Sequence, residues 1–491
     1  MKSKNNAYEI VVGLEVHVQL LTHSKLFCGC STEFGLPPNS ATCPICIGMP
    51  GVLPVMNKQA FELALRTALA LNCQIASFTK WDRKNYYYPD LPKNYQISQY
   101  DLPFSKDGYL EIQTNDRTKR IGIIRVHLEE DAGKMLHDEA GHGRDSKVDL
   151  NRAGTPLCEI VSQPDIRSPE EAKTYLEELR LLLREMQVSD CEMQEGSLRV
   201  DANVNIRFFK DDEKIPTPIV EVKNLNSFRA VERAIQYEAE RQYEEFIQTG
   251  RRLGEVAKAT AGWDDARGVT VIQRRKEEAS DYRYFPEPDL VPVVVSEAWI
   301  NRIRESMPEA PAMRRQRLEQ TYKLTAYDAK VITFQGHAFA DYFEKLAQAC
   351  QDPKAAANWC INEVLQTLND RKISIDVLPL STERMAEFIG LIKKHSINKP
   401  KAREVFAQML STAQAPAAIV QQMGLDVAFD VEQLRELVRQ SIQNNPKAVA
   451  DLKAGKAKAM DALVGPIMRA TKGKAPTDEI RRIMLEELAH N

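Results

Sequence analysis

Two pairs of cysteines near the beginning of the chain have the spacing of a metal site. Cys28 and Cys30 are separated by one residue and Cys43 and Cys46 by two, with a loop between the pairs. Four thiolates in this arrangement can surround a tetrahedral zinc ion and leave no position open for a substrate. The sequence therefore predicts a structural Zn²⁺ site, although four unrelated buried thiols or a nucleic-acid-binding zinc knuckle would use the same residues.

Carboxylates and histidines in two alternating segments could bind a divalent cation. Glu15 and His17 are two residues apart, so they project from the same face of a predicted strand. His127 precedes an acidic run that contains Glu129 and Glu130, and oxygen ligands of this kind suit Mg²⁺. The alternatives are an ordinary polar strand face for the first segment and a solvated acidic turn for the second.

Two further segments carry polar side chains that an ordinary exposed strand seldom uses. Asp201, Asn203 and Asn205 share one face of an otherwise apolar strand, and Asp and Asn are depleted in strands. Lys223 lies just before a predicted helix start, which could bind a phosphate or a carboxylate. Helix capping alone explains residues 226–227 equally well.

Basic and aromatic residues interleave over residues 82–96, a pattern typical of ligand contact or of a polar-aromatic loop core. The sequence has no G-x-x-x-x-G-K-[ST] loop and no G-x-G-x-x-G motif, so any ATP must be held in another way. It has no nucleophile elbow and no recognisable Cys/His protease set, which argues against a glutaminase acting alone.

The elements that must position these residues follow from hydrophobic periodicity. Period-2 alternation predicts strands, each with one apolar and one polar face, at residues 14–20, 124–129 and 198–208. Helices are expected at about 59–71, 169–187 and 228–248. The chain is therefore expected to have an α+β fold, with a mixed α/β domain that contains an antiparallel sheet and a helical remainder.

Composition bounds the number of domains and the compartment. The chain has 491 residues, of which 43% are hydrophobic and 27% charged, so two to four globular domains are expected. It contains no apolar run long enough for a transmembrane helix and no leader-like start, which favours a cytoplasmic protein without membrane contact. Nine cysteines, an odd number, fit metal binding and reduced thiols better than a disulfide framework.

A proline-rich stretch at 284–292 indicates a domain boundary, since proline breaks helices and cannot donate to a strand ladder. We expect domains at 1–293, 294–405 and 406–491.

Residues 447–474 have a net charge of +5 in a chain whose net charge is −3. Such a segment can bind a phosphate backbone, or it can be a solvated helical face.

In this order, the segments resemble one family, the B subunits of the Glu-tRNA(Gln)/Asp-tRNA(Asn) amidotransferases (the GatB/GatE family). The resemblance extends from about residue 8 to the C-terminus. It is carried by GLEVHVQL (13–20), PGVLPVMN (50–57), DRKNYYYPDLPKNYQISQYD (82–101), HLEEDAGK (127–134), VDLNRAGTPLCEIVSQPDIRSPEEA (148–172), EGSLRVDANVNIR (195–207), VEVKNLNSF (220–228), DYRYFPEPDLVP (281–292) and LVGPIMRATKGKA (463–475).

The resemblance implies a cradle-shaped catalytic domain, a helical domain and a small helical tail that contacts tRNA. It also implies that ATP and Mg²⁺ activate the side-chain carboxylate of Glu-tRNA(Gln) or Asp-tRNA(Asn) as an acyl phosphate. Ammonia would then displace phosphate. It would come through a channel from a glutaminase A subunit, and a small C subunit would complete the heterotrimer.

Matching motifs assign roles to individual residues. The family's Mg²⁺ positions correspond to Glu15, His17 and Glu130, and the acid of its R-x-D-A-N strand to Asp201. Strand alternation alone would place Glu129, and not Glu130, beside His127, so Glu129 stays an alternative ligand. Contacts with substrate or channel are expected from Lys84, Tyr86, Lys93, Thr155, Glu159 and Lys223. Contacts with tRNA are expected from Lys453, Lys456, Lys458, Arg469, Lys472 and Lys474.

One feature of the chain is variable in the family, and another departs from the family pattern. Some members lack the four cysteines, so that cluster is expected to serve folding or structure and not the reaction itself. The family's tail usually reads G-Q-x-M where this chain has Pro466 after Gly465.

A competing hypothesis of another class is a non-catalytic, zinc-containing scaffold that binds tRNA. The scaffold hypothesis does not explain the polar faces of three strands. A measurement of ATP consumption distinguishes the amidotransferase from the scaffold.

Overall fold

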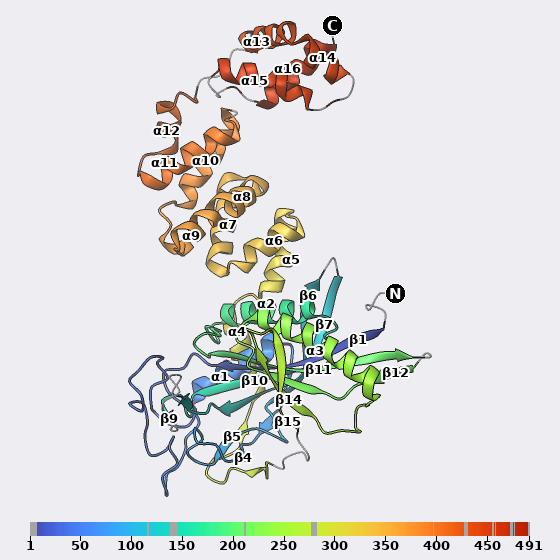
Figure 1. Ribbon diagram of the computed structural model, residues 1–491. Helices are drawn as coiled ribbons and strands as arrows, with labels where there is room; N and C mark the ends of the chain where they lie inside the picture. Colours follow the sequence, from blue (N-terminus) through green and yellow to red (C-terminus); the bar gives the residue numbers. More distant parts are fainter. Residues whose placement is uncertain are drawn as a thin grey trace. The chain divides into compact units, whose positions relative to one another are not determined.

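The structure is a computed structural model (Figure 1), in which the chain forms two compact units, Met1–Ala310 and Pro311–Asn491. The residues described are 7–114, 117–137, 146–210, 213–275, 282–395, 397–426, 431–453, 456, 458–471, 475 and 477–489. No described helix is both long enough and apolar enough to cross a lipid bilayer.

The first unit is built around a large sheet. Its strands are β1 (Tyr8–Gln19), β2 (Gln74–Ile75), β6 (Ser105–Thr114), β7 (Arg117–Glu130), β10 (Pro156–Ser162), β11 (Leu198–Lys210), β12 (Glu213–Pro216), β13 (Val220–Lys223), β14 (Ala259–Asp264) and β15 (Val269–Arg275). The order is β15-β14-β13-β11-β1-β10-β7-β6-β2, and β12 pairs with β11. All pairs are antiparallel except β13 with β14. The predicted α+β class with an antiparallel sheet is confirmed.

Three smaller sheets complete the strands of this unit. One joins β16 (Phe285–Pro286), β4 (Asp82–Asn85) and β5 (Tyr95–Ser98). The others pair β17 (Val293–Val294) with β3 (Phe78–Thr79), and β8 (Lys134–His137) with β9 (Ser146–Asp149). In Figure 1, β4 and β5 lie on the opposite side of the large sheet from α2 (Pro169–Glu185) and α3 (Phe228–Thr249).

Helices cover the apolar face of the large sheet. Leu14, Val16 and Val18 of β1 are fully buried in a hydrophobic cluster that includes residues of α2, α3 and α1 (Lys58–Ala70). Helix α4 (Glu297–Ser306) packs against α1. Ser168 and Ser227 cap the starts of α2 and α3 through their hydroxyl groups. Because side chains alternate along β1, its polar residues project from the opposite face.

The second unit is helical, as predicted. Its helices are α5 (Pro311–Tyr322), α6 (Ala326–Phe334), α7 (His337–Cys350), α8 (Pro353–Trp359), the π-turn η2 (Cys360–Val364), α9 (Leu365–Arg371), the 3₁₀ turn η3 (Ile375–Val377), α10 (Thr382–Lys394), α11 (Lys399–Ser411), α12 (Pro416–Gln422), α13 (Val431–Asn444), α14 (Pro446–Lys453), α15 (Ala459–Ala470) and α16 (Thr477–Ala489).

Two hydrophobic clusters stabilise the helical unit. One runs from Leu318 to Leu425 and the other from Leu434 to Met484. The domain limits predicted after residues 293 and 405 remain predictions.

Candidate functional site

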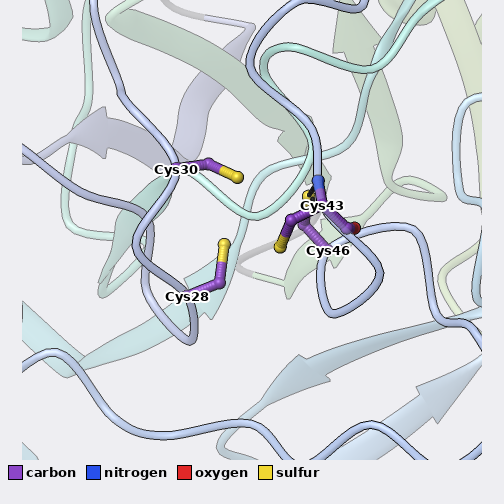
Figure 2. Close-up of side chains that lie close together, drawn as sticks. All are labelled: Cys28, Cys30, Cys43 and Cys46. Carbon is purple, nitrogen blue, oxygen red and sulfur yellow. Dashed lines mark hydrogen bonds between the residues drawn. The ribbon is translucent and has the colours of Figure 1, made fainter.

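The four clustered cysteines converge although they come from two separate loops. The sulfur atoms of Cys28, Cys30, Cys43 and Cys46 lie within 4.8 Å of one another, and Figure 2 shows one pair facing the other. The Cys43 amide donates to the Cys46 sulfur at 3.2 Å. This set of thiols could hold a metal ion such as zinc.

The immediate surroundings favour a thiolate in this cluster. The hydrogen bond with Cys28 is the main cause that lowers the pKa of Cys46 to about 4, and the nearby Lys25 acts in the same direction. Lys25 is fully buried and donates to the carbonyl oxygen of Ala41 at 2.8 Å. Its ammonium group also lies 3.6 Å from the Cys46 sulfur, so a fixed cation stands beside the cluster.

The polar face of the large sheet carries a second group of candidate ligands. Strand pairing places His17 of β1 opposite Glu159 of β10, and Glu159 opposite His127 of β7. The three side chains form a row across adjacent strands, because directly opposed residues project from the same face. Glu129 lies two residues beyond His127 and joins the row from the same face.

This row brings a potential metal group together. The His17 Nε2 atom lies 3.5 Å from Glu159 Oε2 and 3.6 Å from Glu129 Oε1. His127 Nε2 lies 3.3 Å from the same Glu159 oxygen. The candidate ligand atoms of His17, Glu129 and Glu159 all lie within 4.8 Å of one another. Two carboxylates and an imidazole could therefore share one divalent cation.

The charges of this group reinforce one another. Burial alone would lower the pKa of His17, but the hydrogen bond and charge of Glu159, with the charge of Glu129, raise that pKa to about 9. Burial alone would raise the pKa of Glu159, but His127 and His17 hold it well below its usual range. Glu159 is therefore ionised at neutral pH and attracts a cation.

Glu130 lies apart from this group. The ammonium group of Lys93 donates to Glu130 Oε1 at 2.6 Å, and the Ile97 amide donates to Oε2 at 3.0 Å. Glu130 follows Glu129 directly in β7 and points to the other face, as strand alternation predicts. The geometry thus favours Glu129, the alternative ligand, over Glu130, and the ligand assignment itself stays a prediction.

Glu15 and Asp201 lie opposite each other on β1 and β11. Asn203 donates to Glu15 Oε1 at 2.7 Å, and the Lys223 ammonium donates to Asp201 Oδ2 at 2.5 Å. Lys223 also lies 3.0 Å from Glu221. These polar residues of β1, β11 and β13 thus form one connected surface, which the sequence presented as separate segments.

A cavity of about 1150 Å³ gathers most of these side chains. Its lining contains the candidate metal ligands His17, Glu129 and Glu159 together with Glu15 and Asp201. Five cationic side chains line it as well, namely Lys84, Arg125, Arg199, Lys223 and Lys258. A space with acids, cations and aromatic rings is suited to a polar ligand that carries phosphate and a metal ion.

Lys84 and Tyr86 reach this cavity from β4 and the loop after it. The Lys84 ammonium lies 5.1 Å from the centre of the Tyr282 ring and 5.8 Å from that of Tyr86. Burial alone would lower the pKa of Lys84, but the charge of Glu129 raises it overall. Lys84 therefore stays a cation in front of the metal group.

Lys93 and Thr155 do not line the cavity. Lys93 is engaged with Glu130, and its side chain also packs against Gly48 of the second cysteine loop. Thr155 is buried, and its carbonyl oxygen accepts from the Asp131 amide. Their predicted contacts with substrate or channel stay predictions.

The sequence assigned no individual role to Arg199 and Asp131, which line the cavity, or to Gln19, which contacts Asp131. Arg199 of β11 donates to Asp131 Oδ1 at 2.7 Å, and Gln19 of β1 donates to Oδ2 at 2.7 Å. Burial alone would raise the pKa of Asp131, but Arg199 and Arg152 lower it overall. The same-face alternation of β1 and β11 could have identified Gln19 and Arg199, whereas the pairing with Asp131 required the structure.

The predicted tRNA contacts lie in the helical unit. Lys458 and Arg469 are exposed at the two ends of α15, and Lys456 is paired with Asp451 at 2.9 Å. Lys453 ends α14. Lys472 and Lys474 fall outside the described residues. The contacts with tRNA stay predictions.

Comparison with known proteins gives two family matches. Residues 10–301 match the model of the GatB/GatE catalytic domain, and residues 341–488 match that of the GatB domain. The relatives are named as the B subunit of aspartyl/glutamyl-tRNA(Asn/Gln) amidotransferase. The chain is 51% identical to the one from Caldanaerobacter subterraneus over 98% of this chain and 99% of the relative. It is 49% identical to the one from Rhodopirellula baltica, over 98% and 96% respectively.

Proposed function

This chain belongs to the GatB/GatE family of amidotransferase B subunits, and we propose that its cavity activates and amidates the amino acid of a misacylated tRNA. The substrate would be Glu-tRNA(Gln) or Asp-tRNA(Asn), as the names of the relatives indicate. The observation that carries the proposal is the single cavity in which a metal-binding group of acids meets five cationic side chains. A scaffold that only binds tRNA needs neither.

The proposed reaction has two steps. A carboxylate is a poor electrophile, so the side chain first takes the γ-phosphoryl group of ATP, which gives an acyl phosphate and ADP. The nitrogen of ammonia then forms a bond with the acyl carbon, phosphate leaves with the electron pair of the broken C–O bond, and the nitrogen loses a proton. Phosphoryl transfer depends mainly on positioning and charge neutralisation, which the cavity can supply.

The residues fit a bound Mg²⁺ ion. Glu129 and Glu159 offer the hard oxygen donors that Mg²⁺ prefers, and Glu15 offers a third in the same cavity. His17 would complete the set as a ligand, and it would release its proton when the ion binds. When bound, Mg²⁺ would neutralise phosphate charge. Lys84, Arg199 and Lys223 would hold phosphate or carboxylate oxygens.

The four-cysteine cluster would hold a structural Zn²⁺. All four sulfur atoms can reach one ion, and no fifth donor is needed. The cysteine loops consist mainly of turns between β1 and α1, so a metal would fix a segment that has little regular structure of its own.

The partners would be those of a heterotrimer. A glutaminase A subunit would release ammonia from glutamine and a small C subunit would complete the assembly. A channel is needed because water would hydrolyse the acyl phosphate before ammonia arrived. The basic helical tail would contact the tRNA backbone.

The test of this proposal is conversion of Glu-tRNA(Gln) to Gln-tRNA(Gln) by the purified chain with its partners, ATP, Mg²⁺ and ammonium chloride. We expect one ADP for each amide formed. His17→Ala, Glu129→Gln and Glu159→Gln should each lower conversion at least about 100-fold, because metal affinity falls when a ligand is lost. All three variants should still bind tRNA nearly as tightly as the native chain.

Two comparisons make this test specific. His23→Ala, a change at an exposed histidine outside the cavity, should leave conversion unchanged. Glu129→Gln should raise the Mg²⁺ concentration needed for half-maximal activity more than Glu130→Gln does, and the reverse order would restore Glu130 as the ligand. Tight tRNA binding without ATP consumption would contradict the enzyme hypothesis and support the hypothesis of a non-catalytic scaffold.

A further inference from the structure

Four tyrosines form a continuous aromatic wall along one side of the cavity. The rings of Tyr100 and Tyr284 are stacked, with centroids 4.0 Å apart and an interplanar angle of 9°. Tyr282 meets Tyr284 edge to face at 6.2 Å and Tyr86 at 5.9 Å. All four residues line the cavity, and they are called the tyrosine wall below.

The backbone holds the tyrosine wall in place. The Tyr100 amide donates to the Asp82 carboxylate at 3.0 Å, and the Asn85 amide donates to the Tyr282 carbonyl oxygen at 2.8 Å. Tyr284 directly precedes β16, whose Phe285 pairs with Arg83 of β4. The rings therefore come from segments far apart in the sequence that one small sheet joins, so the stack does not depend on side-chain packing alone.

Tyr100 keeps a free face. Its ring is stacked on Tyr284 on one side, and yet the residue is 58% exposed. Exposure alone is ordinary for a tyrosine, but Tyr100 combines it with a ring stack and a place in the cavity lining. The outer face of Tyr100 can therefore accept another planar ring from the cavity or its mouth.

The charges nearby indicate what kind of ring would bind. Lys84 lies against two rings of the tyrosine wall, and Lys223 and Lys258 line the same cavity. A planar group that carries phosphate would place its ring on the tyrosines and its phosphate near these cations. Aromatic stacking with nucleobases is a common way to hold nucleotides and single-stranded ends.

We propose that Tyr100 and Tyr284 form a stacking platform for an adenine ring. This inference rests on the proposed function, which brings two adenine-bearing ligands to the cavity: ATP and the 3′-terminal adenosine of the tRNA. Both share the ring chemistry that the platform would recognise. Tyr100 supplies the contact surface, and Tyr284 supports it from behind.

Binding of three probes to the native complex and to its variants tests the platform. The probes are Mg²⁺-ATP, the trinucleotide CCA and inorganic tripolyphosphate, which has phosphates but no base. Tyr100→Ala should weaken at least one adenine probe about 5- to 150-fold, which corresponds to the loss of one base-stacking contact. Tyr100→Phe should bind that probe like the native complex, because stacking needs the ring and not the hydroxyl group. Tripolyphosphate affinity should not change.

Comparison of the ATP and CCA probes identifies the ligand that supplies the adenine. A loss for ATP alone assigns the platform to the nucleotide, a loss for CCA alone assigns it to the tRNA end, and a loss for both assigns it to a shared subsite. Unchanged affinity for both adenine probes in Tyr100→Ala would overturn the inference. If the native complex itself bound neither ATP nor tRNA, the proposed function would fail together with it.

Two further measurements protect the test against misfolding. Tyr327→Ala removes a tyrosine that is 71% exposed in the helical unit and should leave all three affinities unchanged. Photocrosslinking of the native complex with 8-azidoadenosine nucleotides needs no substitution. It should label the peptides that contain Tyr100 or Tyr284, and labelling confined to other peptides would also overturn the inference.

Discussion

Single side chains in this molecule fall into two electrostatic classes. In the first class, an acid is neutralised by a specific cation, as Glu130 is by Lys93 and Asp131 by Arg199. In the second class, Glu159 faces histidines and remains ionised within the cavity. Acids of the second class are better suited to a metal ion, because the histidines beside them can release a proton when a metal binds. Pairing therefore separates structural acids from candidate ligands.

Glu344 gives a prediction about pH at the residue scale. It accepts from Arg314 at 2.9 Å and from Arg317 at 2.7 Å, and Arg314 is buried. Burial alone would raise the pKa of Glu344, but the two arginines lower it overall from its ordinary value of 4.5. Because the folded pKa is depressed, this stabilisation is present above about pH 4.5 and is lost as pH falls through the folded pKa.

Glu344→Gln should therefore lower the free energy of unfolding by about 1 kcal/mol at pH 7, with part of the pair screened by water. The difference from the native chain should be smaller at pH 3 than at pH 7, because it is lost as pH falls through the folded pKa. Urea unfolding of both proteins at the two pH values measures it. Glu404→Gln removes an exposed partner of Lys401 and should have a much smaller effect. An equal loss for Glu344→Gln at both pH values would contradict the pairing.

At the scale of elements, the antiparallel strands do most to build the site. β1 lies between β10 and β11, so one polar face receives residues from three strands that are far apart in the chain. The opposite, apolar face of β1 is buried under helices. A shift of β7 by one residue would exchange Glu129 for Glu130 in the cavity, so the register of the sheet determines the ligand set.

Gly108 of β6 supports this register and gives a prediction at the element scale. A β-carbon at this position would lie 2.4 Å from the Cys73 sulfur and 2.5 Å from the Leu71 carbonyl oxygen. The carbonyl oxygen belongs to the backbone and cannot move without shifting the end of α1. Gly108→Ala should therefore destabilise the first unit by about 1–3 kcal/mol.

Thermal unfolding followed by circular dichroism checks this expectation. Gly390→Ala provides the control, because Gly390 lies within α10 and a β-carbon there would meet no atom within 4 Å. That change should be neutral or stabilise the chain by up to about 1 kcal/mol, since alanine favours helices over glycine. If the Gly108→Ala variant unfolded at the same temperature as the native chain, β6 would be able to move away from α1.

At the scale of the whole molecule, separate hydrophobic cores imply separate unfolding. The first unit has its own large core, and the helical unit contains two further clusters. We expect calorimetry to show more than one transition, because two-state behaviour is typical of single domains. A strong zinc chelator should lower only the transition of the first unit, by at least about 5 °C, because a ligand that binds the folded state stabilises it.

The Cys28→Ser variant provides the matched control for metal removal. It should unfold at the lower temperature with or without chelator, whereas Cys350→Ser, a change in the helical unit outside the cluster, should respond to the chelator like the native chain. A single transition for the whole chain, or a chelator effect on the helical unit, would contradict this expectation.

The periodic elements and the chemistry of single segments could be predicted from the sequence. Alternation identified β1, β7 and β11, and helical periodicity identified α1, α2 and α3, because each pattern depends on residues adjacent in the chain. The spacing of the cysteines predicted their cluster for the same reason. Family resemblance supplied the proposed reaction and many of the site residues.

Which acids lie together depends on how distant strands pair. Family resemblance assigned Glu130 as a ligand and strand alternation favoured Glu129, whereas strand pairing brought Glu129 and Glu159 to His17 and left Glu130 with Lys93. The tyrosine wall likewise brings Tyr100 and Tyr284 together, although the two residues lie far apart in the sequence. Such contacts depend on strand order and register, which are set by hydrogen bonds and packing between distant segments. Local periodicity cannot encode them, since it is the same for every possible pairing of the strands.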